Sequence, residues 1–289
     1  MERKYMIKGT LNFILLLIVA IPILVLFLVG KPYERGFNCD DQSLRYPYKD
    51  STVHTLVLYF VGTGLPAIAI SLLEWSRTRR ESVGKPVKLC GRNLHSWFWA
   101  AYCSVGTFLF GCACSQLTTD IAKYTVGRLR PHFVDICKPD WSQINCSEIY
   151  VQHIPCTNTD EHRLKEARLS FPSGHASFSA YTMIYLVIYL QVRFKFKGPE
   201  LLRPFLQFVC LMLTFYTSVS RISDYKHHWS DVLSGFIIGT IVAILIALYF
   251  SDLFPRELPT TTKKNETVFL RDYARAENEV HTARTDGGE

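Results

Sequence analysis

The sequence predicts an all-α integral membrane protein with six transmembrane helices. Hydrophobic residues make up 48% of the chain and charged residues 20%, and the apolar residues are gathered in blocks instead of alternating with polar ones. A block of about 20 apolar residues spans a bilayer core, and only helices and closed barrels satisfy the backbone there. Six such blocks occur, over Leu11–Val29, Val53–Leu73, Trp97–Leu117, Phe178–Val192, Phe205–Val219 and Val232–Phe250.

The first block is expected to remain as a membrane helix. Its apolar run exceeds the roughly 7–15 residues of a signal-peptide core, and no clear small-x-small cleavage site follows it. The fourth and fifth blocks are short, so their helices are expected to extend into the flanking residues. The membrane domain is expected to cover residues 1–254, and the polar remainder, 255–289, to be a disordered cytoplasmic tail.

Basic residues in the short loops predict the orientation. Lys and Arg are concentrated between the second and third blocks and between the fourth and fifth, so both loops and both termini are expected in the cytoplasm. The opposite side then receives Gly30–Thr52, Thr118–Ser177 and Ser220–Ser230. We expect the protein in the plasma membrane, with these three segments extracellular or lumenal.

Four of the nine cysteines fall in the outward segments, where disulfides persist. The sequence leaves the pairing open among Cys39, Cys137, Cys146 and Cys156. Asn145-Cys146-Ser147 matches the acceptor pattern for N-glycosylation, and its outward position favours modification of Asn145. The membrane-helix cysteines are interpreted as small apolar packing residues.

The formal net charge of +7 is spread over loops. It forms no strip of alternating basic and aromatic side chains, so no nucleic-acid partner is expected. Attraction to anionic lipid headgroups explains the excess better.

Three polar clusters lie at outward helix ends. The densest, Ser220–Asp231, holds seven ionisable side chains in twelve residues. His227 and Asp231 are four residues apart, so on a helix they would share a face and the carboxylate could reach the imidazole. Arg221 offers a planar fork that suits a phosphate. This cluster therefore provides a nucleophile or base, an acid that orients it, and an anion clamp.

The second cluster follows the third block. Lys123 and Arg130 are seven residues apart, two helical turns, so they would point the same way on a continuous helix. Gly127 and Pro131 indicate instead that the helix end is bent. By itself the pair also fits two basic side chains that reach toward lipid headgroups.

The third cluster precedes the fourth block. Ser173 is a good helix N-cap, and Gly174 allows an anion to approach the backbone closely. Free N–H groups at a helix N-terminus favour anions, and His175 lies in the same turn, where it can donate a proton. A capped helix with an interfacial histidine is the alternative interpretation.

Together the clusters indicate phosphoryl transfer. Three fixed cations and helix-end N–H donors meet the main requirement of that reaction, stabilisation of negative charge. His227 can attack phosphorus, His175 can protonate the leaving alkoxide, and water can then hydrolyse the phosphohistidine. A zinc site at His227, Asp231 and a second histidine is disfavoured, because the nearby cations would repel a dication. No metal or cofactor is therefore expected.

Three motifs resemble the signatures of the type 2 phosphatidate phosphatase superfamily: Lys123-x6-Arg130-Pro131, Pro172-Ser173-Gly174-His175 and Ser220-Arg221-x5-His227-x3-Asp231. The run from Tyr225 to Asp231 is similar to the animal lipid phosphate phosphatases (phospholipid phosphatase, wunen-like). The resemblance implies that His227 is the nucleophile, Asp231 its orienting partner and His175 the general acid. It implies that the phosphate is held by Lys123, Arg130, Ser173, Gly174 and Arg221.

The resemblance also implies a metal-independent enzyme. The implied substrates are phosphatidate, lysophosphatidate, ceramide 1-phosphate and sphingosine 1-phosphate in the membrane, and homo-oligomers are expected. His228 can also reach Asp231, but the family spacing favours His227. Three alternatives stay open: a lipid phosphotransferase, a sugar phosphatase, and a non-catalytic relative that binds lipid phosphates.

Overall fold

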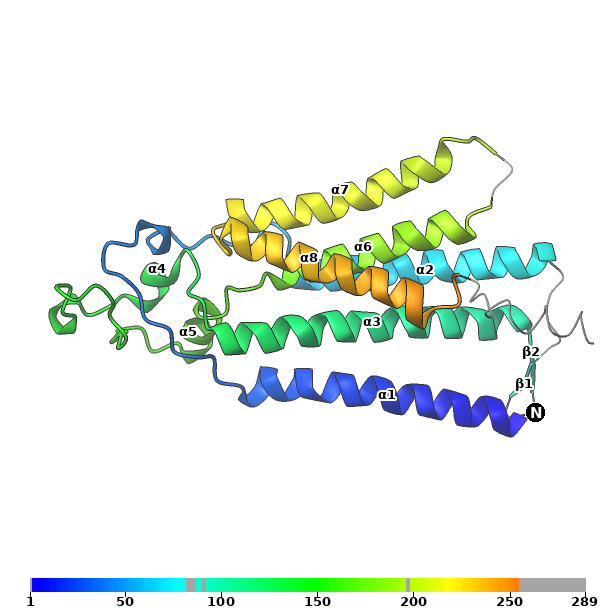
Figure 1. Ribbon diagram of the computed structural model, residues 1–289, viewed down its shortest axis with the longest axis horizontal. Helices are drawn as coiled ribbons and strands as arrows, with labels where there is room; N and C mark the ends of the chain where they lie inside the picture. Colours follow the sequence, from blue (N-terminus) through cyan, green and yellow to red (C-terminus); the bar gives the residue numbers. More distant parts are fainter. Residues whose placement is uncertain (1, 82–86, 90–91, 196–197, 255–289) are drawn as a thin grey trace, which may run out of the picture. The chain divides into compact units, whose positions relative to one another are not determined.

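Six long helices carry the architecture of the computed structural model, which describes residues 2–81, 87–89, 92–195 and 198–254 (Figure 1). They are α1 (Glu2–Val29), α2 (Thr55–Glu81), α3 (Ser96–Val126), α6 (Gly174–Arg193), α7 (Leu202–Ser223) and α8 (Trp229–Leu245). The chain divides into two compact units, Met1–Leu253 and Phe254–Glu289. The predicted tail, 255–289, lies outside the described residues.

Shorter elements connect the long helices. They are the single-turn helices η1 (Gln42–Leu44) and η2 (Trp141–Gln143), the helices α4 (Phe133–Cys137) and α5 (Glu161–Ala167), the π-helical end of α8, η3 (Ile246–Phe250), and the strands β1 (Val87–Leu89) and β2 (Arg92–Leu94). The two strands pair antiparallel in a small hairpin between α2 and α3. The prediction of a mainly helical membrane protein is confirmed.

Five of the described helices are long and apolar enough to cross a membrane. They cover Met6–Val29, Thr55–Arg80, Ser96–Val126, Leu202–Ser223 and Trp229–Phe250. The fourth predicted span corresponds to α6, which is not among them because it carries many hydroxyl side chains. Its hydroxyl groups bond to neighbouring helices: Ser177 to Ser115 on α3 at 3.0 Å, and Ser179 to Thr214 on α7 at 3.0 Å. A helix at the centre of a bundle can be this polar because protein, not lipid, surrounds it.

The centre of the bundle is α6, which contacts α2, α3, α7 and α8. Its aromatic residues Tyr181, Tyr185 and Tyr189 are fully buried and stack along one side of the helix. By contrast, the apolar stretch of α1 contains no fully buried residue, although the helix contacts α3. Such an apolar surface is stable only in contact with lipid or another apolar partner.

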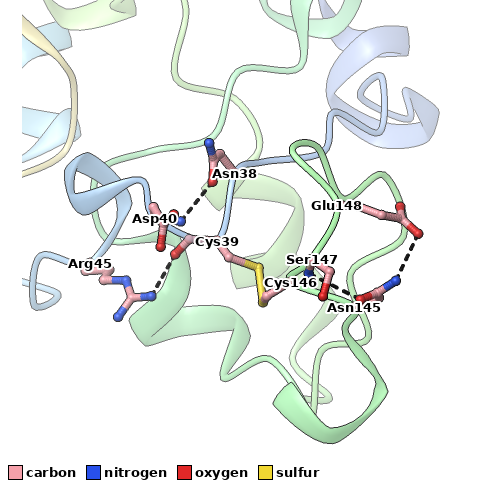
Figure 2. Close-up of a disulfide and its surroundings, with 8 residues drawn as sticks. All are labelled: Asn38, Cys39, Asp40, Arg45, Asn145, Cys146, Ser147 and Glu148. Carbon is pink, nitrogen blue, oxygen red and sulfur yellow. Dashed lines mark hydrogen bonds between the residues drawn. A yellow bond between two sulfur atoms is a disulfide. The ribbon is translucent and has the colours of Figure 1, made fainter.

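The loops at one end of the bundle form a second, smaller core around α4 and α5 (Figure 1). Disulfides join Cys39 to Cys146 and Cys137 to Cys156, which resolves the pairing that the sequence left open. The first disulfide ties the segment 30–54, between α1 and α2, to the long loop between α3 and α6. Figure 2 shows Asn145 beside this disulfide. The Asn145 side chain is exposed.

Candidate active site

All three predicted clusters meet at the end of the bundle that carries α4 and α5. A cavity of about 770 Å³ opens there. The predicted residues that line it are Lys123, Arg130, Gly174, His175, Arg221 and His227. The other two, Ser173 and Asp231, are fully buried behind the cavity wall. Residues more than 100 positions apart in sequence are thus brought to one site.

A bend at the end of α3 places the first cluster. The helix ends at Val126 because Gly127 adopts the left-handed conformation, with φ 55°. The chain then turns, and the N–H of Arg130 donates to the carbonyl of Ala167 at 2.9 Å. Lys123 therefore points from the helix and Arg130 from the segment after it. The bend suggested by Gly127 is confirmed, and both side chains still reach the cavity.

The second part of the site is the first turn of α6. Ser173 caps this helix, and its own N–H donates to the carbonyl of Asp231 at 2.9 Å. A Cβ atom at Gly174 would lie 3.1 Å from Nζ of Lys123, so only glycine leaves that ammonium its full space. In His175, Nε2 is buried without a hydrogen-bond partner among the described residues. This nitrogen is therefore free for a ligand.

A tight turn between α7 and α8 provides the third part. Asp224 ends α7, and Tyr225 adopts a left-handed conformation with φ 54°. The N–H groups of Lys226 and His227 both donate to the carbonyl of Arg221, at 3.0 and 3.2 Å. The turn thus folds the chain back on the end of α7, and the side chains of Arg221, Lys226 and His227 all line the cavity.

Backbone contacts fix the ring of His227. Nδ1 lies 2.7 Å from the carbonyl oxygen of Ser170. A carbonyl only accepts, so Nδ1 carries the proton and Nε2 of the neutral ring keeps its lone pair. Burial lowers the pKa of His227 well below its usual value, and the nearby charges of Arg130 and Lys123 lower it further. His227 is therefore neutral at physiological pH, which is the form a nucleophile needs.

The carboxylate of Asp231 organises the backbone behind His227. It accepts from the Ser170 hydroxyl at 2.6 Å, from the N–H of His228 at 3.1 Å and from Arg128 at 2.6 Å. Nδ1 of His227 is farther away, 3.9 Å from the carboxylate. The shared helical face inferred from the spacing does not form, because α8 begins only at Trp229. The link between Asp231 and His227 therefore runs mainly through Ser170. Its hydroxyl donates to the Asp231 carboxylate, and its carbonyl accepts from Nδ1 of His227.

The cations of the site have few protein partners. Arg221 is 2% exposed and donates to the Val53 carbonyl at 3.4 Å and to the Ser51 hydroxyl at 3.2 Å. Arg130 pairs with Glu166 at 2.9 Å. The Nε atoms of both arginines are buried without a hydrogen-bond partner in the described part of the chain. Buried donors of this kind favour an anionic ligand.

One wall of the cavity is apolar. It is formed on α1 by Ala20, Ile23, Leu24 and Phe27, together with Leu58 of α2. The side chains of Leu24 and Phe27 are 56% and 63% exposed. The same cavity therefore offers buried cations at one side and an exposed apolar surface at another, which suits an amphipathic ligand with an anionic head.

Sequence reasoning missed several residues of the site. Arg128 and Ser170 hold Asp231 and His227, although both stand inside or next to the recognised motifs. Asp120 lines the cavity one helical turn before Lys123, and its carboxylate accepts from Gln116 at 2.9 and 3.1 Å. Its position in a membrane-spanning segment was the signal that could have revealed it, because such a carboxylate is costly without a task.

The fold and the site together define a membrane protein built to receive an anionic, amphipathic ligand. Residues 104–255 match the PAP2 superfamily. The chain is 41% identical to phospholipid phosphatase 1 of Rattus norvegicus, over 92% of this chain and 95% of the relative. It is 42% identical to phospholipid phosphatase 2 of Mus musculus, over 92% and 94%.

A Drosophila melanogaster protein provisionally named as a phosphatidate phosphatase is 43% identical, over 88% of this chain and 71% of the relative. No solved structure matches the chain significantly. The family match covers more than half of the sequence, and the relatives extend over most of it. The chain therefore belongs to the PAP2 superfamily, as its three motifs predict.

Proposed function

We propose that this protein is a metal-independent phosphohydrolase that removes phosphate from lipid phosphates in the membrane. It is a phosphatase of the PAP2 superfamily, and its relatives carry the names of lipid phosphatases. The observation that carries the proposal is the cavity of about 770 Å³, which joins Lys123, Arg130 and Arg221 to an apolar wall on α1. A phosphate bound among the cations would leave the acyl chains against that wall and the lipid.

The reaction proceeds in two steps. Nε2 of His227 attacks phosphorus, the P–N bond forms, and the bond from phosphorus to the lipid oxygen breaks as His175 donates its proton to that oxygen. Water then attacks phosphorus, returns a proton to His175 and releases inorganic phosphate as the P–N bond breaks. Lys123, Arg130 and Arg221 stabilise the charge on the phosphoryl oxygens, with the N–H groups of Gly174 and His175 in the first turn of α6, which Ser173 caps.

Asp231 keeps His227 in place through both steps. Its hydrogen bond from the Ser170 hydroxyl, at 2.6 Å, supports the peptide whose carbonyl holds Nδ1 of His227. The carboxylate at 3.9 Å also stabilises the positive charge that the ring acquires when it becomes a phosphohistidine. The substrates are phosphatidate, lysophosphatidate, ceramide 1-phosphate and sphingosine 1-phosphate, which share a phosphomonoester on an apolar body.

The membrane arrangement has six spans: the five long apolar helices and α6, which is the fourth span in chain order. The site faces the extracellular or lumenal side, and both termini are cytoplasmic, in a plasma membrane protein that forms homo-oligomers. The observed positions of the N-terminus and the β1–β2 hairpin, at the opposite end from α4 and α5, support this topology (Figure 1). Glycosylation of Asn145 would require that end to be outside. The matching test is a mobility shift on glycosidase treatment that Asn145→Gln abolishes.

Phosphate release tests the proposed function. Purified protein in mixed micelles with EDTA is given each of the four lipid phosphates, with glucose 6-phosphate as a sugar-phosphate control. We expect inorganic phosphate and the matching lipid alcohol in equal amounts, and little release from the sugar phosphate. Transfer of phosphate to an added lipid alcohol without net release would favour a phosphotransferase. Loss of activity in EDTA, restored by a divalent ion, would contradict metal independence.

A further inference from the structure

Lys226 lies in the cavity, although none of the three motifs assigns it a role. It is 4% exposed and lines the cavity beside Arg130, Arg221 and His227. Its ammonium lies 3.6 Å from the ring centroid of Tyr48, a cation–π contact. Among the described residues the ammonium group has no hydrogen bond or ion pair. A buried lysine in that position is costly unless an anion joins it.

In the described part of the chain, neither carboxylate near Lys226 forms an ion pair with its ammonium. Asp224 accepts from the N–H and the hydroxyl of Thr52, at 2.8 and 2.7 Å, and lies 3.6 Å from Arg221. Asp50 attracts the ammonium only through space. The charged and titratable groups that face Lys226 are Arg130 and His132 after α3, Arg221 and Asp224 at the end of α7, Tyr48 and Asp50 in the segment 30–54, and the adjacent His227.

Aromatic contacts hold the Lys226 turn from outside. The ring of Tyr225 stacks on Tyr46 at 4.5 Å, and Nδ1 of His132 lies 2.7 Å from the Tyr225 carbonyl. His132 in turn contacts Tyr48 edge to face, at 5.3 Å. Burial lowers the pKa of His132 to about 4, so its ring is neutral and adds no repulsion. The direction of the Lys226 side chain is therefore fixed before any ligand arrives.

We propose that Lys226 is a fourth cation of the phosphate site and binds the phosphoryl oxygens of the lipid phosphate directly. This inference rests on the proposed function. Three cations in one cavity repel one another, and a phosphomonoester dianion removes that repulsion for all of them at once. Lys226 also differs from the arginines because it can lose its charge in an accessible pH range.

The pH dependence follows from this difference. Burial, with Arg130 and Arg221 nearby, lowers the pKa of Lys226 to about 8. Its ammonium is charged below that value and neutral above it, so affinity for a phosphate dianion should fall as the pH rises through about 8. The profile of kcat/KM reports groups of the free enzyme, and it should show this alkaline limb.

The test compares Lys226→Met, Lys226→Arg and a matched control, Lys49→Met. Lys49 also makes a cation–π contact, 4.4 Å from the Tyr225 ring centroid, but does not line the cavity. We measure KM for phosphatidate and inhibition by inorganic phosphate at pH 7. Lys226→Met should raise KM and the phosphate inhibition constant by about 10-fold or more, since a charged hydrogen bond contributes about 1.5–3 kcal/mol. Lys49→Met should leave both unchanged.

The pH profile keeps the inference testable if Lys226→Met folds poorly. In Lys226→Arg the alkaline limb should move up by more than about one pH unit, because arginine stays charged. An unchanged limb in Lys226→Arg, or wild-type constants in a folded Lys226→Met, would overturn the role of Lys226. Failure of the proposed function would give a different result, because wild-type protein would then release no phosphate from any lipid. The role of Lys226 in binding would still be testable, by comparing how far inorganic phosphate stabilises the wild-type and Lys226→Met proteins against unfolding.

Discussion

The two ends of the bundle each bury charge, but they use it differently. At the end away from the cavity, Glu74 of α2 is 1% exposed. One oxygen of its carboxylate accepts from Arg77 at 2.7 Å, and the other accepts from the Tyr189 hydroxyl, with Arg193 at 3.7 Å. Arg193 also donates to the Asp252 carbonyl at 2.7 Å. Both guanidinium groups of this Glu74 network therefore share one buried carboxylate, and the protein itself provides their counter-charge.

At the cavity end, some of the buried cations have no carboxylate partner in the described part of the chain. Lys123, Arg130, Arg221 and Lys226 all line the cavity, and in the described part of the chain only the two arginines form ion pairs, with Glu166 and Asp224. Burying such groups costs free energy, and an anionic ligand that binds them would offset this cost. A closed network holds helices together, whereas an open one beside a cavity is a binding site. The predictions below test that distinction.

His227→Ala should have the largest effect. Removing the nucleophile should lower phosphate release by at least about 10³-fold, in line with losses measured for other nucleophiles. The fold should persist, because the ring makes one hydrogen bond, to the Ser170 carbonyl. Phosphate release and thermal unfolding in detergent are measured on the same sample. Activity retained in a folded His227→Ala protein would contradict the nucleophile assignment.

Arg221→Lys should have the next largest effect. A point charge replaces a planar fork whose position is set by the Val53 carbonyl and the Ser51 hydroxyl. We expect kcat/KM to fall by about 10–100-fold, equivalent to about 1.4–2.7 kcal/mol of transition-state stabilisation. Kinetics for phosphatidate at pH 7 give the value. Near-normal kinetics would show that Arg221 serves the fold, as Glu74 does at the other end.

Gly174→Ala should have a smaller effect. The added Cβ would lie 3.1 Å from Nζ of Lys123, and that flexible side chain can shift by a few tenths of an ångström. The protein should fold normally, since alanine favours helix at this position. We expect KM for lipid phosphate to rise several-fold, about 0.6–1.4 kcal/mol, with a smaller change in kcat. An unchanged KM would mean that Lys123 does not touch the phosphate at this point.

Glu74→Gln should leave the activity per folded molecule unchanged. The amide keeps a similar shape but removes the negative charge that Glu74 presents to Arg77 and Arg193, so the free energy of unfolding should fall by about 1–3 kcal/mol. Thermal unfolding measures the loss, and phosphate release is normalised to folded protein. Loss of activity in folded Glu74→Gln protein would show that the two ends are coupled and would break the comparison.

The candidate site residues could be predicted from the sequence because each motif is local and lies at a helix end. Lys123, His175 and His227 could be predicted to face one side of the membrane from hydropathy and loop charge. The contacts that make the site work join distant segments: the Ser170 carbonyl to His227, Arg128 to Asp231, and Ser51 to Arg221. No periodic pattern encodes such pairings.

The fold, too, could be predicted only in part: the apolar helices were evident from the sequence, but the contacts between distant segments were not. Helices with a largely exposed apolar surface, such as α1, are predicted from their continuous apolar runs. Neighbouring helices shield α6 instead, so α6 can be rich in Ser, Thr and Tyr. Its hydropathy is therefore weak although it is the central helix. Likewise, the cysteine positions indicated disulfides, but pairing Cys39 with Cys146 required the outward loops to be folded on each other.

The phosphoenzyme tests the central claim most directly. Phosphatidate carrying a radioactive phosphate is mixed with excess protein in EDTA, quenched within one turnover, and the label on the protein is examined. The account predicts an acid-labile, alkali-stable label on the peptide that contains His227 and no label in His227→Ala. Release of phosphate without any label on His227, or a label that persists in His227→Ala, would contradict it.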